Sequence, residues 1–237
     1  MAGDRRTTHA SATANYHYIT RTAGADARGR IDFRHRDDLV AHGLELPLNH
    51  PNWAAEDGRI WREIDAATAE MPADAVRAWH VVVSLPPERD SDDWIAMVRA
   101  YANDIASVGP AVAWAIHFRP DGTCGGIPPH VHLLITTRHW RHDANHGKTV
   151  PRWCGPAMRQ QLHGQWLLKL PEDMRRRATS GYQVGSIAAA RPDCSALADL
   201  FGRQPPKSGE ERSRRIRRRP SHRIRKERKC PSEGKGK

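Results

Sequence analysis

The sequence predicts an α+β fold in which helices cover an antiparallel β-sheet. Three observations support this fold class: a β-branched run that stops at two prolines, longer stretches with apolar residues at helical spacing, and two neighbouring strands joined by a loop rich in glycine and proline. The 237 residues suffice for one domain of ordinary size with extensions.

The predicted elements follow one another without an internal repeat. They are a helix over 53–71, a strand over 78–86, a helix over 91–109, strands over 111–118 and 130–137, and a helix over 156–170. Asn52 and Ser91 are expected to cap the first two helices, because their side chains can accept hydrogen bonds from the first free backbone N–H groups.

The sequence contains no membrane segment and no secretion signal. No apolar run approaches the roughly 20 residues that a membrane span requires, and the start lacks an apolar middle region. The four cysteines form no C-x-x-C pair, so neither a zinc knuckle nor a disulfide framework is predicted. We therefore expect a protein of the reducing cytoplasm.

The net charge of +11 is concentrated in a C-terminal tail. Residues 205–237 hold fourteen lysines and arginines against four glutamates, which leaves the preceding residues nearly neutral. The tail has almost no core-forming residues, so we expect it to be disordered when free. Because basic side chains release counterions from phosphate, we expect it to bind nucleic acid, with Arg217, Arg218 and Arg219 among its DNA contacts. The alternative is a solubilising or read-through extension with no evolved partner.

Three histidines on the two neighbouring strands form a candidate metal site. His130 and His132 project from the same face, because side chains alternate along a strand. His117 ends the preceding strand and comes alongside them if the two strands pair as a hairpin. Three neutral imidazoles on one sheet face suit a first-row divalent ion with positions left open for substrate or water. No carboxylate follows closely, which disfavours a cupin-type oxygenase.

Two tyrosines near the N-terminus are candidate nucleophiles. Ions held by neutral histidines often serve phosphoryl chemistry, and a phenol can attack a phosphodiester to form a phosphotyrosyl link. Tyr16 and Tyr18 both lie in the segment ATANYHYITRTAGA. Trp140 and Trp153, in polar surroundings beside arginines, are candidates for stacking on unpaired bases.

These motifs together resemble the MobA/MobL-type plasmid mobilization relaxases. Tyr18-Ile19-Thr20-Arg21 after an Ala-rich stretch resembles the nucleophile motif of the family, and AIHFRPDGTCGGIPPHVHLLITTR resembles its metal motif. LPLNHPNWAAEDGRIWREIDAATAEM and VVVSLPPE resemble the segments between them. The resemblance covers residues 10–170 in the order of the family.

The resemblance implies an HUH-endonuclease fold and a set of residue roles. His117, His130 and His132 would hold a divalent ion, Mg²⁺ or Mn²⁺, and Tyr18, with Tyr16 as the alternative, would attack the scissile phosphate at a transfer origin. Arg21 and Arg138 would contact DNA. The product would be a 5′-phosphotyrosyl strand, formed for conjugative mobilization of a plasmid.

The resemblance also implies a domain plan and partners. Residues 1–170 would be the relaxase domain, 171–204 a partly ordered extension and 205–237 the disordered basic tail. Single-stranded origin DNA would be the substrate in the bacterial cytoplasm, with accessory mobilization proteins and a transfer coupling protein as further partners. No helicase-type phosphate loop is visible, so another protein would unwind the duplex.

Two other functions stay open at this point. The first is a truncated or inactive relaxase that binds DNA and a metal without cutting, since no hydrophobic strand precedes the Ala-rich stretch and His80 stands where the family often carries an acid. The second is a metal hydrolase of another kind with no nucleic-acid partner. Covalent adduct formation on an origin oligonucleotide would separate the nicking relaxase from both of them.

Overall fold

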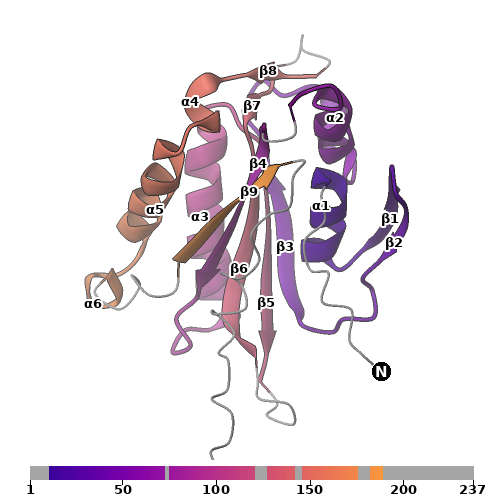
Figure 1. The fold of residues 1–237 in the computed structure, drawn as a ribbon. Helices are drawn as coiled ribbons and strands as arrows, with labels where there is room; N and C mark the ends of the chain where they lie inside the picture. The colour runs from indigo at the N-terminus through magenta and orange to yellow at the C-terminus, as the bar shows by residue number, and fades with distance from the viewer. Residues whose placement is uncertain (1–10, 73–74, 121–126, 142–145, 176–181, 189–237) are drawn as a thin grey trace, which may run out of the picture. The chain divides into compact units, whose positions relative to one another are not determined.

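The computed structural model describes residues 11–72, 75–120, 127–141, 146–175 and 182–188 (Figure 1). Its centre is a five-stranded sheet in the order β3-β5-β6-β4-β9, and every neighbouring pair is antiparallel. The strands are β3 (Leu39–Glu45), β4 (Val76–Ser84), β5 (Val112–Arg119), β6 (Ile127–Thr136) and β9 (Tyr182–Ala188). The predicted antiparallel sheet is confirmed.

Helices cover both faces of the sheet, as predicted (Figure 1). On one face lie α1 (Ala12–Thr20) and α2 (Arg59–Ala67), and on the other lie α3 (Ser91–Ser107) and α5 (Ala157–Lys169). The shorter elements are η1 (Asn52–Ala55), α4 (Pro151–Cys154), α6 (Glu172–Arg175), and the two-stranded ribbons β1 (Ala23–Asp26) with β2 (Gly29–Asp32) and β7 (Arg138–His139) with β8 (Lys148–Thr149).

Large apolar side chains fill the space between the sheet and α3 and α5. Alternate residues of β4, β5 and β6 face this core, among them Trp79, Trp114 and Leu133, and all are almost fully buried. The opposite face of the same strands carries smaller residues, including Ala113 and Ala115. This alternation fixes the register, because a shift of one residue would turn every large side chain to the other face.

Two details of the predicted helices are wrong. The helix over 53–71 is divided into η1 and α2, because Gly58 has a φ of +64° and begins α2 from a left-handed conformation. Asn52 therefore belongs to the short 3₁₀ turn and caps no α-helix. Asp90, and not Ser91, caps α3: its carboxylate accepts a hydrogen bond from the backbone N–H of Asp93 at 2.9 Å.

The C-terminal part of the predicted organisation can be compared with the structure only where residues are described. β9 lies within 171–204 and pairs along β4, at the edge of the central sheet. The tail over 205–237, with Arg217, Arg218 and Arg219, lies outside the described residues. Within the described part of the chain, no helix has both the length and the apolar character that crossing a membrane requires.

Candidate metal centre and nucleophile

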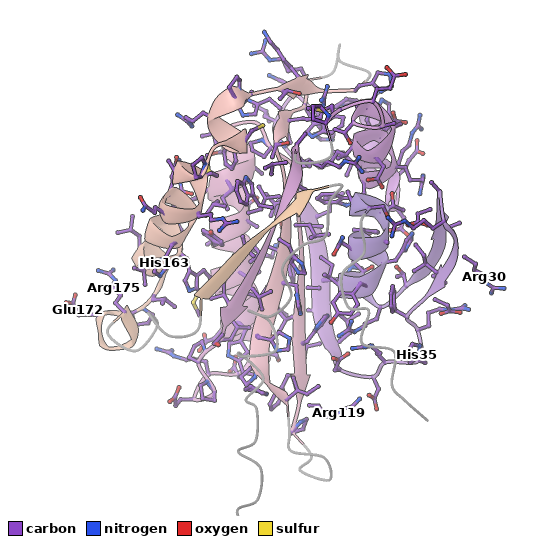
Figure 2. All side chains as sticks on the ribbon, viewed as in Figure 1. Arg30, His35, Arg119, His163, Glu172 and Arg175 are labelled. Atoms are coloured by element: carbon purple, nitrogen blue, oxygen red, sulfur yellow. The ribbon has the colours of Figure 1, made fainter. Side chains whose placement is uncertain are left out.

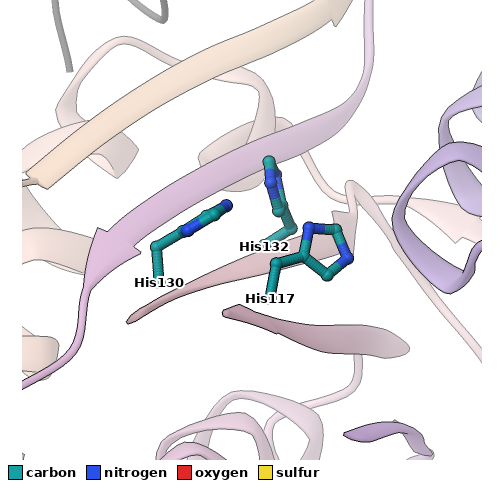
Figure 3. A group of neighbouring side chains, drawn as sticks. All are labelled: His117, His130 and His132. Carbon is teal, nitrogen blue, oxygen red and sulfur yellow. The ribbon is translucent and has the colours of Figure 1, made fainter. Parts of the chain in front are cut away.

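Strand pairing brings the three predicted histidines together (Figure 3). His117 on β5 lies directly opposite His130 on β6, and His132 follows two residues later on the same face, opposite Ala115. All three side chains are buried, and one nitrogen of each lies within 4.8 Å of the corresponding nitrogens of the other two. The predicted cluster is present, on the sheet face that α1 covers.

The hydrogen bonds of His117 settle where its lone pair lies. The carbonyl oxygen of Ile19 can only accept, so Nε2 of His117 donates to it at 2.7 Å. A guanidinium can only donate, so Nδ1 accepts from Nη2 of Arg21 at 3.1 Å. His117 therefore carries its proton on Nε2 and its lone pair on Nδ1.

His130 is oriented in a similar way by a backbone acceptor. Its Nδ1 donates to the carbonyl oxygen of Pro128 at 2.8 Å, which leaves the lone pair on Nε2. Nδ1 of His132 lies 2.8 Å from Nε2 of His80, and either ring can be the donor. Outer N–H bonds of this kind are the usual way in which proteins aim histidine ligands at a metal.

The three rings are neutral at neutral pH. Burial, with a smaller contribution from the nearby Arg21 guanidinium, lowers the pKa of His117 to about 3. Burial also lowers the pKa of His130 and, more strongly, that of His132. A metal takes the neutral form of imidazole, so these three buried, uncharged rings suit a divalent transition-metal ion. At His117 the ion would replace the hydrogen bond that Nδ1 accepts from Arg21.

Tyr18 lies beside this cluster and Tyr16 does not. The ring of Tyr18 packs edge-on against the ring of His132, with 5.9 Å between the ring centroids, and is flanked by Phe33. Tyr16 is 6% exposed, stacks on Trp61, and donates its hydroxyl hydrogen bond to Asp57 at 2.5 Å. Burial and Asp57 both raise the pKa of Tyr16, which makes it a poor nucleophile.

Arg21 joins the nucleophile helix to the histidines. It ends α1 in the left-handed conformation, with a φ of +55°. Nε and Nη2 donate to the two carboxylate oxygens of Asp38, at 2.7 and 2.8 Å, and Nη1 donates to the carbonyl oxygen of Tyr18. The two charged side chains are 4% and 5% exposed. The predicted DNA contact by Arg21 does not fit this burial, and its observed contacts are internal.

The other predicted DNA contacts within the described residues are also engaged or buried. The guanidinium of Arg138 donates to the carbonyl oxygens of His146 and Gly147 and to the hydroxyl of Thr149, so it is bonded to β8 and the residues just before it. Trp140 and Trp153 are 1% and 0% exposed, so the prediction that they stack on unpaired bases is wrong. Their basic neighbours Arg141 and Arg152 are exposed, whereas the two rings are buried.

Sequence reasoning missed two parts of the site. Asp38 and the carbonyl group of Ile19 both orient site residues, but neither belongs to a recognisable motif. Asp38 lies 17 residues from Arg21, and Ile19 lies 98 residues from His117, so only the folded chain brings these groups together.

Comparison with known proteins places this arrangement in a family. The model of the MobA/MobL family matches residues 9–169. The conjugal transfer protein TraA of Agrobacterium fabrum is 28% identical over 131 residues, which are 51% of this chain and 11% of that protein. The 43 kDa relaxation protein of Salmonella typhimurium is 26% identical over 133 residues, 53% of this chain and 35% of that protein.

The chain thus spans a small part of the TraA protein and about a third of the relaxation protein. A solved structure described as "Molecular Basis of Vancomycin Resistance Transfer in Staphylococcus aureus" shares the fold, with a TM-score of 0.54 at 17% identity over 70% of this chain and 86% of that one. Since the family model matches more than half of the residues, this chain belongs to the MobA/MobL family.

Proposed function

We propose that this chain is a relaxase domain that nicks one DNA strand at a plasmid transfer origin, for conjugative mobilization. The observation that carries the proposal is the contact between Tyr18 and His132 within the three-histidine cluster. Membership of the MobA/MobL family and the relatives named for conjugal transfer and relaxation support it.

The proposed reaction is a transesterification at phosphorus. The phenol oxygen of Tyr18 loses its proton and forms a bond to the scissile phosphorus, and the bond to the 3′-oxygen of the upstream nucleotide breaks. That oxygen takes up one proton, so that the proton count balances and a free 3′-hydroxyl is left. One phosphoester replaces another, so the 5′-phosphotyrosyl link retains the bond energy needed to rejoin the strand.

His117, His130 and His132 would hold a divalent ion, which would supply positive charge against a non-bridging phosphate oxygen. The candidate donors are all imidazole nitrogens, a set that suits transition metals better than Mg²⁺, so of the two ions expected from the sequence we favour Mn²⁺. The chain's own contribution is to keep the three rings neutral and fixed in direction.

Several wider expectations belong to the same proposal. The chain would divide into a relaxase domain over 1–170, a partly ordered extension over 171–204 and a basic tail over 205–237, in which Arg217, Arg218 and Arg219 would anchor DNA. The compartment would be the bacterial cytoplasm. Accessory mobilization proteins and a transfer coupling protein would be the partners. The family match supports a DNA substrate.

The test is covalent adduct formation on single-stranded origin DNA with Mn²⁺, read as a shifted band on a denaturing gel. We expect the parent chain to form the adduct and Tyr18→Phe to abolish it. Tyr16→Phe is the matched control, because it removes a buried hydroxyl two residues away and should keep the adduct. An adduct that persists in Tyr18→Phe would contradict the assignment of the nucleophile.

A second candidate function is DNA binding with a metal but without cleavage. One observation favours it. The carboxylate of Asp38 acts on His117 and His130 through its charge, but Arg21 occupies both of its oxygens. Origin DNA that binds with an Mn²⁺-dependent affinity, but never forms an adduct with the parent chain, would favour this function over cleavage.

A further inference from the structure

His80 contacts the histidine cluster from a third strand. It lies on β4 opposite Leu134, two residues along the strands from the pair formed by Val82 and His132. Its Nε2 is 2.8 Å from Nδ1 of His132, and the two ring centroids are 5.1 Å apart. A side chain outside the predicted ligand set therefore makes a direct hydrogen bond to one of the three candidate ligands.

The direction of that hydrogen bond decides whether His132 can bind a metal. A neutral imidazole has one N–H and one lone pair. If His80 donates, Nδ1 of His132 is the acceptor and its Nε2 carries the proton. If His80 accepts, His132 is protonated at Nδ1 and its lone pair is on Nε2. Nε2 is then the only ring nitrogen of His132 that can act as a ligand, since His80 occupies the other.

The other two rings indicate which direction fits the site. His117 and His130 each use one nitrogen to donate to a backbone carbonyl, of Ile19 and of Pro128, and thereby keep the lone pair on the other nitrogen. A metal site needs the same arrangement at all three rings. For His132, the group in the position of the outer acceptor is Nε2 of His80.

We propose that His80 is a positioning residue that accepts the Nδ1–H of His132 and so fixes the Nε2 lone pair of His132 as the third metal donor. The proposal rests on the metal site of the proposed function, but it makes a statement about the tautomer of His132 that holds before any metal binds.

The tautomer can be measured directly in the metal-free full chain. Long-range ¹H–¹⁵N correlation spectra distinguish a protonated ring nitrogen from a bare one, with His132 identified from a His132→Gln spectrum. We expect Nδ1 of His132 to be protonated and its Nε2 bare. A protonated Nε2 on His132 would overturn the proposal, because His80 would then be the donor. This measurement requires no variant of His80 and no metal.

Metal affinity provides the second measurement, by calorimetric titration of the full chain with Mn²⁺. His80→Leu removes the acceptor and should weaken Mn²⁺ binding by roughly 10- to 100-fold, the range seen when an outer partner of a histidine ligand is lost. His80→Gln keeps an acceptor oxygen near the position of Nε2 and should bind Mn²⁺ within a few-fold of the parent.

His163→Leu is the matched control, since His163 lies on α5, on the far side of the sheet from the cluster (Figure 2). It should leave the Mn²⁺ affinity unchanged. Equal Mn²⁺ affinity in His80→Leu and the parent would overturn the role of His80 while the metal site stands. A parent chain that binds no Mn²⁺ would instead refute the metal part of the proposed function, and the tautomer of His132 would still decide the role of His80.

Discussion

The two faces of the central sheet are built from the same strands but carry different kinds of side chain. The face toward α3 and α5 bears Trp79, Trp114 and Leu133 within one large apolar cluster. The face toward α1 and α2 bears alanines, among them Ala113 and Ala115, together with the histidines. Large residues that exclude water suit stability, and small ones allow a helix to lie close to the strands.

This difference explains how the nucleophile helix reaches the histidines. The alanines of β5 lie in the same buried cluster as Tyr16 and Ile19 of α1. The backbone carbonyl group of Ile19 comes within 2.7 Å of His117, which a bulkier layer of side chains would prevent. We infer that the α3 face mainly supplies folding energy and that the α1 face mainly sets the geometry of the site.

The largest effect on stability is expected from truncation on the α3 face. Leu133→Ala removes a fully buried side chain and should lower the free energy of unfolding by about 2–5 kcal/mol. Urea denaturation measures this loss. Below the melting temperature of the variant, Mn²⁺ affinity should stay within a few-fold of the parent value. A large loss of Mn²⁺ affinity in a folded Leu133→Ala chain would contradict the division between the two faces.

A smaller loss of stability, with a larger loss of activity, is expected from overfilling the α1 face. Ala115→Leu adds bulk two residues before His117 and should cost about 1–3 kcal/mol of unfolding free energy. Because the added side chain pushes α1 away from β5, adduct formation with origin DNA should fall at least 10-fold. Ala102→Leu, a similar overfilling on α3, is the control that should leave the adduct rate of the folded chain unchanged.

A third expected effect concerns pH and involves the histidines of the α1 face. Burial lowers the pKa of His80 to about 4 and contributes most to lowering that of His117 to about 3, both from an ordinary value of 6.5. As pH falls below about 6.5, the unfolded chain binds protons that the folded chain does not. The free energy of unfolding of the metal-free protein should therefore decrease from pH 7 to pH 5.

Urea denaturation at pH 7 and pH 5 measures this decrease. His80→Gln removes one of the responsible groups, so its unfolding free energy should change less over the same interval. An equal pH dependence in the two chains would show that His80 is not buried in its neutral form.

The histidine cluster was predictable from the sequence because it depends on local rules. His130 and His132 share a face through strand alternation, and His117 meets them through the pairing of two adjacent strands. Three strands of the central sheet and the helices that pack on its α3 face were predictable for the same reason. The β1–β2 ribbon and the edge strands β3 and β9 were not predicted, since short strands with mixed polar and apolar residues carry little periodic signal.

The groups that orient the site could not be predicted from local sequence patterns. Arg21 and Arg138 resembled DNA contacts in the sequence, because a basic side chain in a polar or motif-rich segment shows no sign of an internal partner. In the folded chain Arg21 meets Asp38 and Arg138 meets backbone carbonyls. Hydrogen bonds between a side chain and a backbone group far away in the sequence occur at no regular separation, so no sequence pattern predicts them.

The end of α1 has a further consequence for how site variants behave. The last carbonyl groups of a helix have no partners within the helix and need others. In α1 two of them are capped by the site itself: Arg21 donates to the carbonyl of Tyr18, and His117 donates to that of Ile19. Replacing His117 would therefore leave a carbonyl uncapped and fray the turn that carries the nucleophile, even in a chain that never encounters a metal.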